Sequence, residues 1–235
     1  MTFIRDTHLL YTVQPGDTLF SIANRFGSTM ERIEQANFLY PPVTDRYLIY
    51  PGWKLLVPVG VDQTDKVYYV TPDGQSLWLP AFVYEIERGD TLYSISQKMN
   101  IAIESILYLN QARPGFSRDV LFIGFTLLIP LAASRNIIVT SPLPSESIRH
   151  GERVEGFARV FEGNVLIEVQ DDQGVIVSHE RFTTAVDGGP NVGYFSTSIP
   201  FDQQPTTKGG FVRVYSRSAE DGSIIDLVQV RVQFD

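Results

Sequence analysis

The chain contains nearly the same phrase twice, and this repeat limits its fold more than any other feature. Tyr11 matches Tyr84 at an offset of 73 residues, and residues 11–37 share ten identical positions with residues 84–110. The later runs WKLLVP and FTLLIP continue the match at an offset of 72. Self-similarity at a fixed offset is typical of repeated structural units. The sequence therefore predicts two small homologous modules.

Each copy predicts a strand, two helices and a second strand. The opening runs YTV and YEI alternate like short strands, and apolar residues follow at helical spacing. The Gly-Asp pair before the first helix predicts a turn, with Asp17 as the helix cap in the first copy. Ser28 and Glu31 have the spacing of a capping box for the second helix of that copy. Asn37 and Asn110 fall near the end of the second helices, where asparagine tolerates a left-handed backbone.

Both modules resemble the LysM domain, a small βααβ module that binds polymers of N-acetylglucosamine such as peptidoglycan and chitin. The resemblance rests on YTVQPGDTLFSIA, IEQAN and IYPGWKLLVP in the first copy, and on YEIERGDTLYSIS, ILYLN and FIGFTLLIP in the second. It implies a shallow glycan groove between the loop before the first helix and the loop after the second. The glycan-binding residues implied are Gly16, Asp17, Thr18, Leu19, Phe38, Leu39 and Tyr40, with Gly89, Asp90, Thr91, Leu92, Gln111, Ala112 and Arg113 in the second copy.

Such a groove suits an uncharged sugar. An N-acetyl sugar offers an amide, a methyl group and apolar ring faces, which backbone groups and apolar side chains can bind without any ionised residue. No cofactor is needed. The alternative interpretation is that the Gly-Asp-Thr-Leu run forms only a turn and a helix cap.

The segment that connects the copies, residues 60–82, predicts a β-hairpin. VYYV and SLWL flank the turn sequence TPDGQ, a pattern typical of two short antiparallel strands. A decayed repeat is the alternative, because YVTPDGQSLW echoes YTVQPGDTLF. The aromatic residues Tyr68, Tyr69 and Trp78 form either a sugar platform or, more commonly, a packing cluster.

The last hundred residues have a different sequence pattern from the two repeats. Residues 137–235 contain about seven β-rich runs separated by turns such as DDQG, DGGPN and EDGS, which fits an antiparallel sandwich. Val228, Val230 and Val232 alternate with polar residues in the final strand. The early SP, GFARVFEGNV and DDQG resemble the immunoglobulin-like domain of bacterial spore germination proteins. That resemblance implies a spore or cell-envelope setting.

These patterns predict a multidomain α+β and all-β chain, with two βααβ modules followed by an immunoglobulin-like sandwich. The expected order is a LysM domain at 10–59, a connecting segment at 60–82, a second LysM domain at 83–131, a linker at 132–136 and the sandwich at 137–235.

The net charge of −8 is unevenly distributed. Residues 11–58 carry a net charge of 0, residues 84–130 carry −1 and residues 137–235 carry −6. There is no basic stripe, so nucleic acid and anionic membrane surfaces are poor partners. No apolar run approaches the roughly 18 residues that a membrane span needs.

The sequence offers no recognisable catalytic motif. It has no cysteine, and none of His8, His150 and His179 stands in a metal-ligand spacing. There is no GxSxG motif and no phosphate-binding glycine loop. We expect no metal, no cofactor and no enzymatic activity. A wall hydrolase stays open as a third class, because the pairing of two carboxylates is spatial.

We expect non-catalytic binding of peptidoglycan or another N-acetylglucosamine polymer, with two tethered grooves reinforcing one another. The sandwich, residues 137–235, is expected to meet a protein partner at the cell wall or spore envelope. The alternative is a structural component of the spore envelope whose LysM folds no longer bind glycan. The first residues lack the apolar core of a secretory signal, and synthesis in the mother cell would reconcile this with a spore location.

Overall fold

A computed structural model describes residues 1–41, 44–45, 47–59, 65–188 and 190–235. Residues 60–64 of the predicted connecting segment lie outside this description. The chain divides into two compact units, residues 1–96 with 101–130 and residues 97–100 with 131–235. None of the described helices has both the length and the apolar character that a membrane crossing needs.

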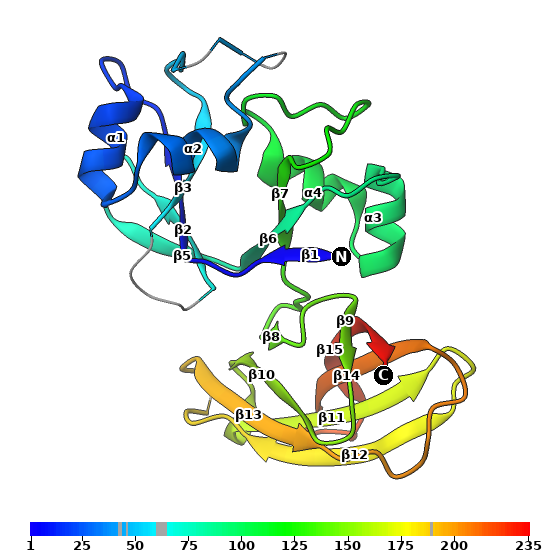
Figure 1. Ribbon diagram of the computed structural model, residues 1–235. Helices are drawn as coiled ribbons and strands as arrows, with labels where there is room; N and C mark the ends of the chain where they lie inside the picture. The colour runs from blue at the N-terminus through cyan, green and yellow to red at the C-terminus, as the bar shows by residue number, and fades with distance from the viewer. Residues whose placement is uncertain (42–43, 46, 60–64, 189) are drawn as a thin grey trace. The chain divides into compact units, whose positions relative to one another are not determined.

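Apart from residues 97–100, both copies of the repeat belong to the first unit. Each copy has the predicted order of strand, helix, helix and strand (Figure 1). The first copy consists of β2 (His8–Thr12), α1 (Leu19–Phe26), α2 (Met30–Asn37) and β3 (Lys54–Pro58). The second consists of β6 (Ala81–Glu85), α3 (Leu92–Met99), α4 (Ile103–Asn110) and β7 (Thr126–Pro130). The two strands of each copy pair antiparallel.

The helices begin one residue later than the sequence predicts. Thr18 is the N-cap of α1, and its hydroxyl accepts a hydrogen bond from the Ser21 amide at 3.0 Å. The prediction that Asp17 caps the helix is therefore wrong. Thr29 caps α2, so the predicted Ser28–Glu31 capping box is also wrong. The Ser28 hydroxyl instead donates to the carbonyl of Pro58 at 2.6 Å.

Asn37 and Asn110 are buried connectors rather than left-handed residues. The Asn37 side-chain amide donates to the carbonyls of Ile33 and Leu56, and its oxygen accepts from the Leu56 amide, each at 2.7 Å. Asn110 makes the same three bonds in the second copy. The left-handed residue at the end of α2 is Phe38, with φ of 55°. Each asparagine thus joins the end of its helix to the closing strand, which explains its presence in both copies.

Two additional elements tie the copies together. The strands β4 (Val67–Val70) and β5 (Ser76–Leu79) form an antiparallel pair, and β4 lies parallel to β2. The N-terminal strand β1 (Thr2–Ile4) pairs with β6 of the second copy, as Figure 1 shows. The resulting sheets have the orders β3-β2-β4-β5 and β1-β6-β7. A strand that precedes the first copy in sequence therefore completes the sheet of the second.

The two copies also share a hydrophobic cluster. It combines Leu10 and Leu56 of the first copy, Val83 and Leu128 of the second, and Val67 of β4. Burying one such side chain contributes about 1.5–3 kcal/mol. The copies therefore form one packed unit, which differs from the expected pair of separate, tethered modules.

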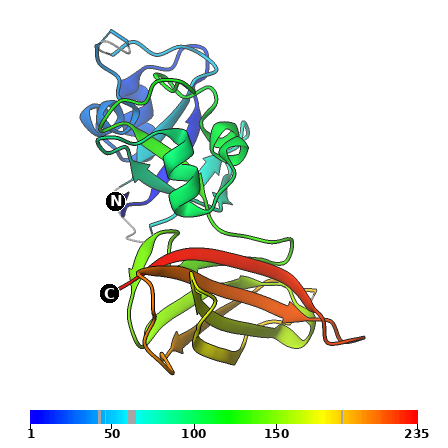
Figure 2. The same ribbon diagram turned by 90° about the vertical axis from the view of Figure 1, so that its right-hand side faces the viewer.

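The second unit is a sandwich of two sheets, as expected. One sheet has the order β13-β10-β8 and the other β12-β11-β14-β15-β9. Its strands are β8 (Ile137–Ser141), β9 (Glu146–Ile148), β10 (Glu152–Ala158), β11 (Asn164–Asp171), β12 (Ile176–Thr184), β13 (Gly193–Ile199), β14 (Gly209–Arg217) and β15 (Ile224–Phe234). Figure 2 shows β15, in red, running along the sandwich. Val228, Val230 and Val232 of β15 are buried, which confirms the predicted alternation.

Candidate glycan-binding surface

The two loops that border each predicted groove are joined by backbone hydrogen bonds. In the first copy the Val13 amide donates to the carbonyl of Trp53 at 2.8 Å, and the Gly52 amide donates back to Val13 at 2.9 Å. The second copy repeats both bonds between Ile86 and residues 124–125, each at 2.9 Å. The loop before the first helix is thus fixed against the end of the loop after the second helix.

Gly16 and Gly89 form the tight turns of these loops. Their φ angles are 88° and 87°, in the left-handed region that favours glycine. Apart from the glycine itself and its two chain neighbours, no heavy atom lies within 4 Å of the position that a Cβ atom would take at either residue. The backbone conformation therefore calls for glycine, while the surface above it is open to a ligand.

Asp17 and Asp90 face inward and stabilise the turns. The Asp17 carboxylate accepts from the Tyr11 hydroxyl at 2.6 Å and from the Gln14 amide at 2.8 Å. Asp90 accepts equivalent bonds from Tyr84 and Glu87. Burial, followed by the bond to Asp90, raises the pKa of the Tyr84 hydroxyl. Both carboxylates are already hydrogen-bonded within their own loops. They would therefore support a ligand site by holding the loop in place, without contacting the ligand.

In each motif the threonine lies on the surface and the leucine lies in the core. Thr18 and Thr91 are exposed at the helix starts, and the Thr91 hydroxyl accepts from the Ser94 amide at 3.0 Å. Leu19 and Leu92 are buried. Each motif therefore presents its glycine and threonine to solvent while its leucine anchors the helix.

The residues after α2 turn toward the second copy. Leu39 is fully buried in the same core cluster as Leu19. The Phe38 ring lies 4.3 Å from Tyr40 and stacks on Phe122 of the second copy at 5.8 Å. Tyr40 remains exposed. Phe38 and Tyr40 therefore lie at the junction between the copies.

The corresponding residues of the second copy, residues 111–113, differ in their exposure to solvent. Gln111 and Ala112 are exposed, and the Ala112 carbonyl accepts from the Lys54 amide of the first copy at 2.9 Å. Arg113 is only 4% exposed. It donates to the carbonyl and hydroxyl of Thr126.

The Arg113 guanidinium also donates to the Asn110 side chain at 3.1 Å and to the carbonyl of Ala36, in the first copy, at 3.1 Å. Burial lowers its pKa to about 9, which leaves it protonated at neutral pH. We expected the Arg113 side chain to face a glycan, but it is buried. Arg113 instead fastens the second copy to the first.

Several exposed aromatic rings beside the loops were not predicted as site residues. Phe20 and Tyr93, which follow the Thr-Leu pairs, are 63% and 66% exposed. The sequence signal was an aromatic residue at the same place in both copies. In the first copy Tyr50 is exposed and packs edge-on against Trp53 at 5.0 Å. The equivalent residues of the second copy, Phe122 and Phe125, contact Phe38.

The sandwich has a surface of another kind at one end. A cavity of about 440 Å³ is lined by Phe161, Phe182 and Ile225 together with Arg159 and Arg217. The two phenylalanines are 71% and 61% exposed. Ile225, which also lines the cavity, is 42% exposed. Exposed apolar residues gathered at one cavity are typical of an interaction site.

Two family models match the chain. The LysM domain model matches residues 11–58 and 84–130. The model of the immunoglobulin-like domain of bacterial spore germination matches residues 136–223. The chain therefore has two LysM domains followed by an immunoglobulin-like domain of the spore germination type. In the described residues, no group of three or more His, Cys, Asp or Glu side chains fits a metal ion.

Curated relatives share these domains. YdhD of Bacillus subtilis, named as a candidate sporulation-specific glycosylase, is 26% identical over 94% of this chain and 50% of its own length. The N-acetylmuramoyl-L-alanine amidase sle1 of Staphylococcus epidermidis is 31% identical over 52% of this chain and 33% of its own. The secreted LysM effector ELP2 of Colletotrichum higginsianum is 34% identical over 51% of this chain and 65% of its own. The chain thus spans half or less of the two bacterial relatives.

Proposed function

We propose that this chain binds peptidoglycan or another polymer of N-acetylglucosamine without cleaving it. The LysM pair would place the immunoglobulin-like domain at the cell wall or spore envelope. The observation that supports this most is the pair of open loops turned by Gly16 and Gly89, held in the same hydrogen-bonded geometry in both copies. Glycan binding by these loops is what the LysM family implies.

The chemistry of the loops suits a neutral ligand. The Asp17 and Asp90 carboxylates are already bonded within their turns, so a glycan would meet backbone groups and the threonines. Aromatic rings at Phe20, Tyr93 and Tyr50 supply flat apolar surface nearby. Such a surface fits the amide and ring faces of an acetamido sugar.

Binding without cleavage is the interpretation that the matched domains favour. LysM and the immunoglobulin-like domain are binding and interaction modules, and together their models match most of the chain. The enzyme names belong to YdhD and sle1, which extend well beyond the matched regions. The proposal is that this chain uses the binding part of that architecture.

The full chain can be sedimented with insoluble peptidoglycan to test this. Tyr50→Ala is expected to weaken binding about tenfold, because an aromatic contact contributes up to about 1.5 kcal/mol. Tyr108→Ala is the matched control, since Tyr108 is an exposed tyrosine on α4 outside both groove loops. Failure of the wild-type chain to pellet, or release of soluble sugars by it, would contradict the proposal.

The proposal also assigns a partner to the sandwich. Its apolar end, formed by Phe161, Phe182 and Ile225, fits a protein of neutral or basic character. Phe161 and Phe182 stand exposed beside the 440 Å³ cavity. The sandwich carries −6, which disfavours both anionic wall polymers and a second copy of this chain. A protein that inserts an apolar side chain between the two rings satisfies both conditions.

A partner isolated from spore-envelope extract and purified should form a defined complex with the full chain. Phe161→Ser and Phe182→Ser are expected to weaken that complex, whereas Val120→Ser, an exposed apolar residue of the first unit, should not. Equal binding by all three variants, or concentration-dependent self-association of the chain alone, would reject the apolar end as the contact.

A further inference from the structure

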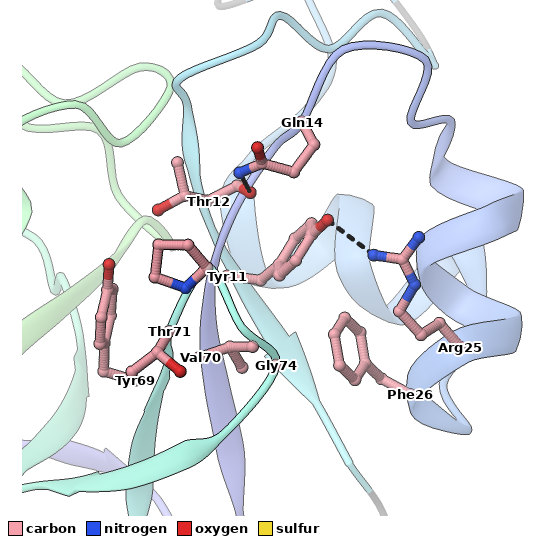
Figure 3. Close-up of a pocket in the computed structure, with 10 residues that line it drawn as sticks. Tyr11, Thr12, Gln14, Arg25, Phe26, Tyr69, Val70, Thr71 and Gly74 are labelled. Carbon is pink, nitrogen blue, oxygen red and sulfur yellow. Dashed lines mark hydrogen bonds between the residues drawn. The ribbon is translucent and has the colours of Figure 1, made fainter.

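A second cavity lies in the first unit, and its lining residues come from the first copy of the repeat and from the β4–β5 hairpin. It has a volume of about 320 Å³ and is bordered by β2, by the end of α1 and by the turn between β4 and β5. Figure 3 shows Tyr11 near the middle of the lining residues, with Arg25 and Phe26 on one side and Thr71 on the other. Its size is at the lower end of the range of small-ligand pockets.

Aromatic rings form much of its wall. Tyr11 and Phe26 meet edge to face, with ring centroids 5.2 Å apart. The Arg25 guanidinium lies 5.7 Å from the centroid of Tyr11, which extends this flat surface. Tyr69 of β4 also borders the cavity, while its side chain packs against the cluster shared by the two copies, on the other face of the sheet. A ring-shaped ligand with an apolar face can pack against such walls.

The charges at the cavity compensate one another. Arg25 donates to the Tyr11 hydroxyl at 2.8 Å and lies 3.5 Å from the Asp17 carboxylate. Tyr11 in turn donates to Asp17. Arg25 is exposed, so part of its fork of donors faces solvent. An anionic ligand would meet the carboxylate behind this arginine, so the site favours an uncharged ligand that both donates and accepts hydrogen bonds.

The second copy has different residues at the positions that line this cavity. It retains the bond between Tyr84 and Asp90, but Lys98 and Met99 replace the arginine and phenylalanine of α1. The hairpin that closes the cavity adds to β2, whereas the strand added to β6 is β1. The residues that line the cavity therefore come from the first copy and its hairpin, and Gln14 of the loop before α1 is the one that the cavity shares with the groove border.

We infer that this cavity is an additional binding site for a single uncharged sugar residue. The inference takes its ligand class from the proposed function, and its position from the cavity alone. The polar groups are suited to sugar hydroxyls, and the rings of Tyr11 and Phe26 to a pyranose face. The site adds a contact to the polymer that the groove loops do not supply.

The full chain, labelled with ¹⁵N and titrated with N-acetylglucosamine, separates this site from the groove. Saturable shifts of the Thr71 and Gly74 amides and of the Arg25 side-chain signal are expected. The Gly16 and Thr18 amides report the groove in the same spectra. Shifts at the groove without shifts at the cavity overturn this inference and leave the proposed function standing; shifts at the cavity alone do the opposite.

A matched pair of variants tests the cavity by affinity. Phe26, at the end of α1, lines the cavity, whereas Tyr108, an exposed tyrosine on α4, does not. Phe26→Ala is expected to weaken the cavity shifts about tenfold, by loss of a ring contact, and Tyr108→Ala to leave them unchanged.

Phe26 also packs against the core of the first copy, so Phe26→Leu keeps the test valid if the alanine variant unfolds. This change retains an apolar side chain but removes the ring, and it is expected to weaken the cavity shifts severalfold. Equal affinities for the wild type, Phe26→Leu and Tyr108→Ala would overturn the inference.

Discussion

Replacing Arg113 with alanine is expected to destabilise the LysM pair without removing any predicted groove surface. The guanidinium donates four hydrogen bonds, to Asn110, twice to Thr126, and to Ala36 of the other copy. A hydrogen bond from a charged donor contributes about 1.5–3 kcal/mol. The gross loss is offset by several kcal/mol, because the variant no longer buries a charge. The net expected loss is about 3 kcal/mol.

Tryptophan fluorescence measures this loss selectively. The chain has two tryptophans, Trp53 and Trp78, and both lie in the first unit. With a urea dependence of about 1.5 kcal/mol per molar, a loss of about 3 kcal/mol lowers the unfolding midpoint by roughly 2 M. Arg88→Ala is the control, because Arg88 is exposed in the turn before α3.

The result that refutes this reasoning is a midpoint shift no larger than that of Arg88→Ala. It would mean that the buried arginine makes no net contribution, as some buried charges do. A second contrary result is a loss of glycan binding with unchanged stability. It would mean that Arg113 contacts the ligand.

Three further predictions follow from the same unit. Gly16→Val should cost about 1 kcal/mol or more and weaken glycan binding, because φ is 88°; unchanged stability by fluorescence would remove the basis for this. Glycan binding by the full chain should change little from low to physiological salt, since the LysM domains carry 0 and −1; a tenfold fall would point to an ionic contact. Burial lowers the pKa of His8 below its usual value, so the unfolded chain binds its proton first. Stability should therefore decrease as the pH falls below about 6.5, and His8→Gln should reduce this slope. His8 is the only histidine of the first unit, so fluorescence between about pH 5 and pH 7 isolates its effect.

Local pattern and the repeat were enough to predict the modules. Alternation and helical spacing determine the elements of each copy, and the alternating valines of β15 predict the sandwich. The residue that caps α1 could not be predicted from the sequence. Asp17 and Thr18 are both good N-cap residues, and only the backbone geometry distinguishes them. Asn37 was assigned a backbone role, whereas its side chain bridges a helix and a strand nineteen residues away.

The junction between the copies could not be predicted from local pattern. β1 is three residues long, and nothing in its sequence indicates that it pairs with β6 about eighty residues later. Arg113 occupies a loop position that aligns with Tyr40, and an arginine in a loop is usually exposed. Its burial depends on the Ala36 carbonyl of the other copy. The cavity beside Tyr11 depends in the same way on a hairpin from outside the repeat.

Calorimetric titration of the full chain with a soluble oligomer of N-acetylglucosamine tests the central claim most directly. The account predicts saturable heat at low and at physiological salt, with the oligomer recovered at its original length. Absence of saturable heat would mean that the LysM folds have a structural role alone, and recovery of shortened oligomers would mean that the chain is an enzyme.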